Sequence, residues 1–362
     1  MEENRTIKIN PLPVPTWNWL KMNSAEMTLK SVCAERLEPR IENVDNVVFS
    51  YNADGFEKIE TGCGTNSDIL FASKEASPLV ITAPKGKKIA SPVILNYDCG
   101  KKDSAVCAQI IYAKENSELT VIIVSRSDEG AAGMFALRTL VFAEKNAVVR
   151  LVKAQLLDKN TANVDDTGIR TEENASVTVS HIILGGGKTF TGLAAALDGY
   201  KADFKSDAAY LCTGAQKLDM NFVVRHLGRS TNSFMHATGA LYGSAHKTYR
   251  GTIDLKKGCA GSDGEEQEET LLLSPAVVNK SIPMILCGEE DVAGEHGATI
   301  GRLGDDVLFY MQSRGFSKRE AENTVARSKV AAGRYFSYIM KWIRLRICVS
   351  GWKPCCPKPA SA

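Results

Sequence analysis

The sequence predicts an all-β core that folds as a β-solenoid, with an N-terminal arm before it and a helical region after it. Three observations support this prediction. From Leu79 to residue 303, short apolar runs alternate with turn residues. Within this tract, similar segments recur at intervals of about 30 residues. Clear signals for the start and the end of a helix follow only after residue 304.

The repeat is marked by asparagines. Asn116, Asn146 and Asn174 begin three similar segments, at intervals of 30 and 28 residues, and a fourth copy without the Asn begins near Lys201. Each Asn precedes roughly alternating apolar residues, as expected where a residue that tolerates left-handed geometry precedes a strand. A repeat of this length predicts a solenoid or a propeller. We favour the solenoid because the strands are short and no blade signature appears, and a β-sandwich with chance similarity at three turns is the alternative.

Four regions are predicted along the chain. In the first, the stretch from Ala25 to Arg40 is weakly helical and Pro39 ends it, while Trp17 and Trp19 could anchor the arm. In the third, Asp305 and Asp306 begin a short helix that ends at Gly315. Ser317 and Glu320 then form a capping box for a second helix. The predicted regions are an N-terminal helical and irregular region (1–78), the β-helix core (79–303), a C-terminal helical region (304–340) and an atypical basic tail (341–362).

Composition limits the function classes. The chain has 362 residues, 44% of them hydrophobic and 24% charged, which is ordinary for a globular protein. The net charge is +2, but residues 341–362 hold five basic residues and no acid, and subtracting these five leaves −3 for the rest. A mildly acidic body argues against nucleic acid as the main partner.

The cysteines and the apolar runs predict a cytosolic protein. The first residues lack the basic-then-apolar layout of a signal peptide, and no run of about 18 apolar residues that could span a membrane occurs. In the cytosol, most of the ten cysteines would be reduced and buried as small apolar side chains. They form no CxxC pair, which argues against a zinc ribbon or a self-contained ferredoxin-type cluster. The cysteines are residues 33, 63, 99, 107, 212, 259, 287, 348, 355 and 356.

One segment concentrates possible metal ligands. Cys287 is followed by four carboxylates and His296, the last carboxylate being Glu295. Because Gly294, Gly297 and Gly301 interrupt the pattern, His296 is predicted to lie at a strand edge or in a turn. The alternative is a solvated acidic loop with an ordinary turn histidine.

Two other patterns have ordinary explanations. The run from Gly185 to Thr189 resembles the end of a phosphate loop, but Ile182 stands where that motif requires Gly. We therefore interpret the glycines as a wide turn between strands and expect no bound nucleotide. His226, His236 and His246 are ten residues apart, and we favour hydrogen-bonded or surface histidines over a metal site.

The chain resembles the SufB/SufD family of iron–sulfur cluster assembly proteins over most of residues 10–335. The sequences that carry the resemblance are His296-Gly297-Ala298-Thr299, Leu308-Phe309-Tyr310, Pro84-Lys85-Gly86 and Tyr249-Arg250-Gly251. The resemblance implies a right-handed parallel β-helix that dimerises through its core and binds a SufC-type ABC ATPase by its helical region. It also implies a non-catalytic scaffold that holds a transient iron–sulfur cluster. The partner could be a SufB-type chain or a second copy, and no membrane contact is expected.

The family motifs transfer to individual residues. The resemblance implies that His296 is the interface histidine and a cluster ligand. Glu295 and His296 match the first two residues of the Glu-His-Glu motif of SufB, whereas Gly297 replaces the third. Glu268 stands where SufB has its sulfur-accepting cysteine, which makes the chain SufD-like there; its carboxylate could hold iron, and Cys287 is the nearest thiol.

The tail departs from the family, because acidic amphipathic helices are expected beyond Phe336 and the sequence there is basic and contains prolines. ATPase docking is the expectation that this departure affects most. Two other classes remain possible. A structural solenoid would need no cluster chemistry, and a carbohydrate-active β-helix enzyme would need secretion and carboxylates aligned along the coils.

Overall fold

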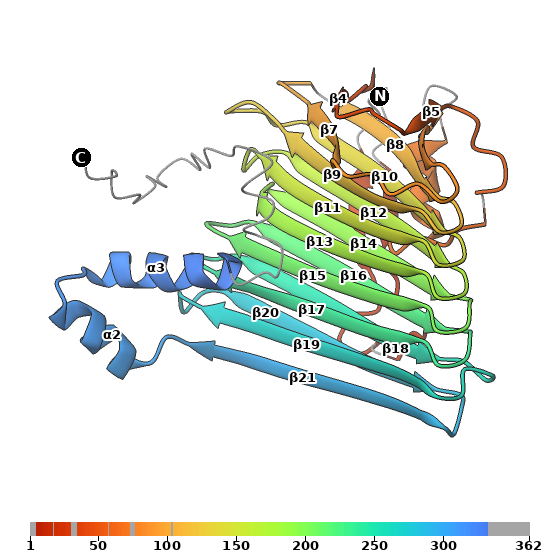
Figure 1. The fold of residues 1–362 in the computed structure, drawn as a ribbon. Helices are drawn as coiled ribbons and strands as arrows, with labels where there is room; N and C mark the ends of the chain where they lie inside the picture. The colour runs from red at the N-terminus through yellow and green to blue at the C-terminus, as the bar shows by residue number, and fades with distance from the viewer. Residues whose placement is uncertain are drawn as a thin grey trace, which may run out of the picture.

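The computed structural model describes residues 5–331 except 17, 30–34, 57, 73–76 and 103. The chain winds back and forth between two large sheets, so that successive strands of the core join opposite sheets (Figure 1). The first sheet contains β3 (Glu35–Arg36), β5 (Val48–Ser50), β6 (Leu79–Ala83), β8 (Ser104–Ala113), β10 (Met134–Ala143), β12 (Ala162–Thr171), β14 (Lys188–Leu197), β16 (Lys217–His226), β18 (His246–Leu255) and β20 (Val278–Cys287). The second contains β4 (Arg40–Glu42), β7 (Val93–Asp98), β9 (Glu118–Arg126), β11 (Val148–Leu157), β13 (Ser176–Gly185), β15 (Asp203–Cys212), β17 (Asn232–Leu241), β19 (Ser262–Leu272) and β21 (Val292–Arg302).

This arrangement confirms the predicted β-solenoid. From β6 to β21, neighbouring strands of each sheet run parallel, and their apolar side chains fill the space between the two sheets. The β-sandwich alternative is wrong, because the hairpins and Greek keys of a sandwich give antiparallel pairs. Antiparallel pairs occur at the start of the solenoid, where β4 joins β7 and β5 joins β6.

The asparagine repeat marks one corner of each coil. Asn116, Asn146, Asn174 and Lys201 have φ angles of 59°, 58°, 54° and 58°, as the sequence predicts for left-handed turn residues. Their side chains also form a ladder. The Asn146 amide donates to Oδ1 of Asn116 at 2.9 Å, and the Asn174 amide donates to Oδ1 of Asn146 at 3.2 Å. The repeat therefore sets the register of the coils.

The N-terminal arm is built from strands. β1 (Arg5–Ile9) and β2 (Ala25–Leu29) form an antiparallel pair. The predicted helix from Ala25 to Arg40 is therefore wrong. Side chains alternate between the two faces of β1 and β2, and Ile7 and Met27, which lie on the inward face, pack on the first sheet. Trp17 lies outside the described residues, and Trp19 is 95% exposed, so Trp19 does not anchor the arm.

Polar contacts attach the arm across the coils. The Asn10 amide donates to Asp219 at 2.8 Å, and the Arg250 guanidinium donates to the carbonyl of Met22 at 2.7 Å. Farther along, η1 (Thr65–Ser67) and α1 (Asp68–Phe71) follow a segment that crosses the outer face of the first sheet.

The C-terminal region is helical as predicted. α2 (Asp305–Ser313) and α3 (Lys318–Ala331) follow the last strand (Figure 1). The capping box is present, since the Ser317 backbone N–H donates to the Glu320 carboxylate at 2.8 Å and the Glu320 backbone N–H donates to the Ser317 hydroxyl oxygen at 3.3 Å. α3 packs on β15 and β17 through Ala326 and Val330. Residues 332–362, including the basic tail, lie outside the described residues, and the four region boundaries stay a prediction.

Candidate functional site

The solenoid ends in two edge strands. β20 is the last strand of the first sheet and β21 is the last strand of the second, and neither has a neighbour on its outer edge within the described ranges. An edge of this kind presents unpaired backbone N–H and C=O groups to other chains. The inner-facing residues of these two strands, which we call the open end, follow from their register with β18 and β19. They are Asn279, Ser281, Pro283, Ile285 and Cys287 on β20, and Val292, Gly294, His296, Ala298 and Ile300 on β21.

His296 lies in the middle of β21 and is exposed. The sequence predicts that His296 lies at a strand edge or in a turn. It lies in an edge strand, and the glycines do not interrupt that strand, because β21 pairs with β19 along its whole length. A Cβ atom at Gly294 would lie 3.1 Å from the Ile285 side chain across the coil, so that side chain would have to shift by a few tenths of an ångström. The register pairs His296 with Glu266, whose side chain points into the solenoid, so His296 faces the same inner side.

Glu295 points to the opposite face from His296. Successive residues of a strand alternate in direction, and the register pairs Glu295 with Glu265 on the outer surface. Within one chain, therefore, these two neighbours in sequence do not converge on one ion from the same side of the strand.

Cys287 is exposed at the end of β20, and its thiol contacts the carbonyl oxygen of Glu289 at 3.1 Å. The contact between Ile285 and Gly294 aligns β20 with β21 and leaves Cys287 and His296 on opposite sides of it. Cys287 is thus aligned with Val292, four residues before His296 on β21. At about 3.3 Å per residue, this offset amounts to about 13 Å.

Glu268 points inward and is 2% exposed. Its carboxylate forms an ion pair with Lys247, accepts a hydrogen bond from Thr270 at 3.0 Å and accepts another from Ser281. Burial lowers the pKa of Lys247, and the carboxylate of Glu268 opposes that shift. The structure thus places Glu268 in a polar network in which neighbouring side chains satisfy both of its oxygens. It lies on β19, the strand next to the open end.

Glu266 is a second inward carboxyl group, and it was not predicted from the sequence as a site residue. It is 2% exposed, and it occupies the space left by Gly251, where a Cβ atom would meet Oε1 at 2.1 Å. Burial, and then the charge of Glu268, raises the pKa of Glu266 to about 8. The period of two in the run from Glu265 to Glu269 could have identified it, because Glu266 and Glu268 share one face of a strand.

The remaining acidic residues of this segment belong to a turn. Glu289 accepts a hydrogen bond from the backbone N–H of Gly258 at 2.8 Å, which ties the last turn to the one before it. The described residues include no group of three or more His, Cys, Asp or Glu side chains arranged to hold a metal ion.

The three evenly spaced histidines lie apart, as the favoured interpretation predicts. The buried ring of His226 is hydrogen-bonded to Thr231 and Ser233, at 2.7 and 2.8 Å. His236 contacts Asp207 at 2.9 Å, and His246 is exposed at the start of β18.

The glycine-rich run forms the turn between β13 and β14. Gly185 and Gly186 have φ angles of 83° and 77°, which confirms a turn between strands. The turn is tighter than predicted, because only Gly186 and Gly187 separate β13 from β14. A Cβ atom at Gly185 would lie 1.9 Å from the carbonyl oxygen of Leu157, so this turn packs closely on the preceding coil.

The described cysteines also follow the prediction. Cys63, Cys99, Cys107, Cys212 and Cys259 are buried and only Cys287 among the described thiols is exposed. Burial raises the pKa of Cys212 to about 12, so its thiol stays protonated and behaves as a small apolar group. Residues 33, 348, 355 and 356 lie outside the described residues.

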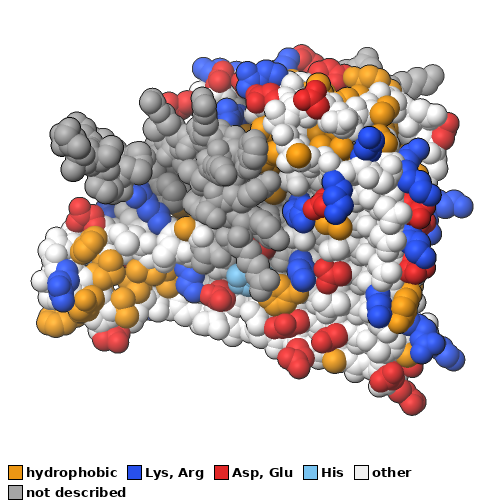
Figure 2. Space-filling model, viewed as in Figure 1, with side chains coloured by type: hydrophobic (Ala, Val, Ile, Leu, Met, Phe, Trp, Pro, Cys, Tyr) orange, Lys and Arg blue, Asp and Glu red, His pale blue; other side chains and the backbone are white. Residues whose placement is uncertain are grey.

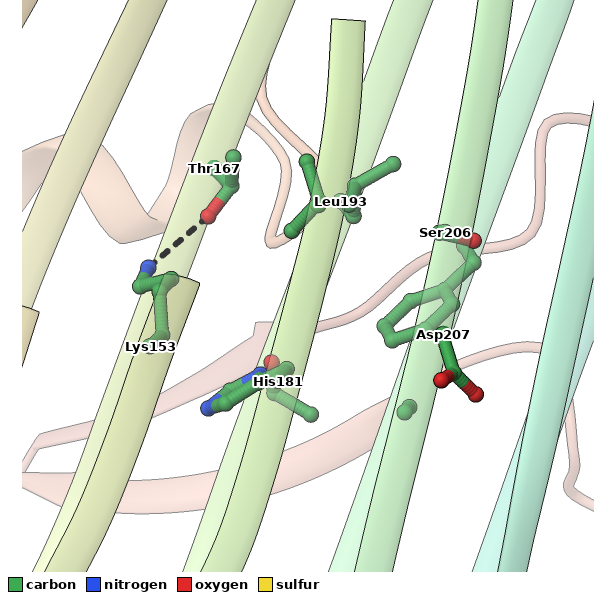
Figure 3. Close-up of a pocket in the computed structure, with 10 residues that line it drawn as sticks. Lys153, Thr167, His181, Leu193, Ser206 and Asp207 are labelled. Atoms are coloured by element: carbon green, nitrogen blue, oxygen red, sulfur yellow. Dashed lines mark hydrogen bonds between the residues drawn. The ribbon is translucent and has the colours of Figure 1, made fainter. Parts of the chain in front are cut away.

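A small cavity lies inside the solenoid, between the coils of β11 to β16 (Figure 3). Lys153, Thr167, His181 and Ser206 line it, and the Lys153 ammonium donates to the Thr167 hydroxyl at 3.0 Å. Burial lowers the pKa of His181 to about 4. The cavity has a volume of about 10 Å³, which is room for about one water molecule and too little for an iron–sulfur cluster.

A family model described as "SUF system FeS cluster assembly, SufBD core domain" matches residues 98–329. These residues run from the end of β7 to the last turn of α3. They therefore include most of the solenoid, the whole open end and nearly all of the described helical region.

The chain is also similar to proteins from three organisms, two of which have names from the same system. The chain is 23% identical over 247 residues to the iron–sulfur cluster assembly protein SufD of Bacillus subtilis, covering 67% of this chain and 56% of that protein. It is 24% identical over 271 residues to a SufBD family protein of Archaeoglobus fulgidus, covering 70% and 68%. It is 21% identical over 261 residues to the chloroplastic protein ABCI7 of Arabidopsis thaliana, covering 69% and 55%.

The chain thus spans about half the length of the B. subtilis and A. thaliana relatives. The family model, in contrast, covers more than half of this chain, and its residues coincide with the parallel coils and the helices that follow them. The chain belongs to the SufB/SufD family of the SUF iron–sulfur cluster assembly system and is a SufD-like member.

Proposed function

We propose that this chain is a non-catalytic, SufD-like scaffold subunit of a cytoplasmic complex that assembles iron–sulfur clusters and passes them on. The cluster is cargo in this proposal. The observation that carries the proposal is the position of His296, an exposed imidazole on the inner face of β21, which is one of the two edge strands of the last coil. An imidazole can bind the iron of a nascent cluster.

The edge strands favour pairing with another chain of the same fold. β20 and β21 are each about ten residues long, and a partner with matching edges would satisfy their free backbone groups. We propose a SufB-type subunit or a second copy as this partner. Pairing would bring His296 to the seam between the two chains, where the partner supplies the other ligands.

The candidate ligands differ in how readily they could bind the iron of a nascent cluster. His296 is exposed, and none of the ion pairs in the described part of the chain involves it. Glu268 would first have to leave Lys247, so a role as an iron ligand requires a rearrangement of that pair. Cys287 would act from the end of β20, and Glu295 would act from the outer face of β21.

The helical region offers a separate surface for an ATPase. Exposed apolar side chains gather over α2 and the turn after it (Figure 2), and they are Val307, Phe309, Tyr310 and Phe316. Phe309 is 74% exposed, which is typical of a side chain that a partner covers. We propose that a SufC-type ABC ATPase docks here and that ATP is bound and hydrolysed in that partner.

The test is His296→Ala in a complex co-expressed with SufB-type and SufC-type chains. We expect the cluster formed from iron and sulfide under anaerobic conditions to fall at least about tenfold, because an iron ligand is lost. Visible absorption measures the cluster, and circular dichroism checks that the fold is retained.

His246→Ala is the matched control, because it removes another exposed histidine from the same half of the solenoid. Unchanged cluster formation in His296→Ala would remove His296 from the proposal. If the unmodified chain formed no cluster and captured no ATPase, a purely structural solenoid would be the better account.

A further inference from the structure

Glu266 is the neighbour of His296 on the adjacent strand. The register of β19 and β21 pairs the two residues, and both belong to the inner face of their strands. Neighbouring strands are about 4.8 Å apart, so side chains that share a face and a register position are within reach of each other. Because both side chains leave the same face of their strands, the His296 ring can reach the carboxyl group of Glu266.

One oxygen of the Glu266 carboxyl group lacks a well-formed hydrogen bond, while the Tyr249 hydroxyl lies close enough to interact with the group. Glu266 is 2% exposed, yet its Oε2 atom has no hydrogen-bond partner within the described part of the chain. Gly251 supplies the space for it, because any side chain there would overlap Oε1. Buried acceptors without a partner are uncommon in folded proteins, and one at a site often has a functional reason.

The other inward carboxylate of the same strand is a useful contrast. Glu268 is in register with Ala298, and Lys247, Thr270 and Ser281 satisfy its oxygens. Glu266 alone of these two carboxylates combines an oxygen that lacks a well-formed hydrogen bond with a register position opposite His296.

We propose that Glu266 is a positioning residue for His296. The Oε2 atom of its carboxyl group accepts a hydrogen bond from one ring N–H of His296 and leaves the other ring nitrogen, unprotonated, for the iron that arrives as cargo. Such a contact fixes the tautomer and the orientation of a metal-binding imidazole and makes it a stronger ligand. This inference depends on the proposed function, because it assigns His296 to iron.

The first test needs no metal. In the full-length chain labelled with ¹⁵N at histidine, the His296 ring nitrogens, assigned by their loss in His296→Ala, are expected to show one predominant tautomer. Glu266→Leu should give a mixture of tautomers, because the acceptor is gone. Glu266→Gln keeps an acceptor oxygen in the same shape and should retain most of the preference. Identical tautomer ratios in the unmodified chain and Glu266→Leu would overturn the inference.

The second test measures binding of Co²⁺, an air-stable substitute for Fe²⁺, to the full-length chain. Glu266→Leu is expected to weaken binding about 10- to 100-fold, Glu266→Gln less, and His296→Ala at least as much as Glu266→Leu. Asp263→Asn is the control, since it removes one negative charge from the exposed outer face of the same strand. It should leave the affinity unchanged.

The outcomes separate the inference from the proposed function. If His296→Ala weakens Co²⁺ binding and both Glu266 variants bind normally, Glu266 does not position His296, but the proposed role of His296 remains. If His296→Ala binds Co²⁺ as well as the unmodified chain, the proposed function fails and the inference fails with it. Should Glu266→Leu not fold, Glu266→Gln with its matching shape decides between these outcomes.

Discussion

Lys247→Met is expected to lower the free energy of unfolding by about 3–5 kcal/mol, since breaking a buried ion pair leaves a buried charge behind. Both Lys247 and Glu268 are almost completely buried. The Lys247 ammonium also lies 5.6 Å from the ring centre of Tyr210 and 5.4 Å from that of Tyr249. Urea unfolding followed by circular dichroism measures the loss.

Two further variants make this prediction specific. The double variant Lys247→Met with Glu268→Leu should recover most of the lost stability, because replacing both members of a buried pair with apolar residues is often neutral. Lys280→Met, an exposed lysine on the next strand, should change stability by less than about 0.5 kcal/mol. A cost for Lys247→Met no larger than that for Lys280→Met would show that the buried pair does not hold the coils in register.

Gly192→Ala is expected to lower the free energy of unfolding by about 3 kcal/mol, at the upper end for overpacking. A Cβ atom on Gly192 would lie 2.2 Å from the backbone nitrogen of Cys63, and a flexible side-chain movement cannot relieve a contact with backbone. The segment around Cys63 would have to move away from the sheet. It would then lose the hydrogen bond from the Cys63 N–H to Asp166, which is 2.9 Å long.

Gly301→Ala is the matched control for this change. Gly301 also lies in a strand, but no atom would lie within 4 Å of an added Cβ there. Replacing glycine at such a position is neutral or stabilises by about 0.4–1 kcal/mol through the unfolded chain. Equal stability of the two variants in urea would contradict the close crossing of the segment over β14.

The solenoid could be predicted because its information is local and repeated. Successive coils repeat a left-handed residue such as Asn116 or Asn146 before a strand, and this spacing places equivalent corners of the coils next to each other. The arm could not be predicted in the same way. The strand from Ala25 to Leu29 pairs with Arg5–Ile9 and packs on the first sheet, and these partners are distant in sequence.

The candidate site could be predicted in part. A short motif identifies His296, but its position within a strand depends on the pairing of β21 with β19. The state of Glu268 depends on Lys247, which is 21 residues earlier in the chain and on the opposite sheet. Sequence reasoning missed Glu266, because its pairing with His296 depends on the register of β19 and β21 and its unpartnered oxygen depends on packing inside the solenoid.

Amide hydrogen exchange along β20 and β21 tests the central claim most directly. In the isolated chain, about half of the amides of each edge strand point away from their sheets and should exchange quickly. When the complex with a SufB-type chain forms, we predict that the outward amides around His296 become protected. A stable complex in which these amides still exchange at the rate of the isolated chain would place the partner elsewhere and contradict the account.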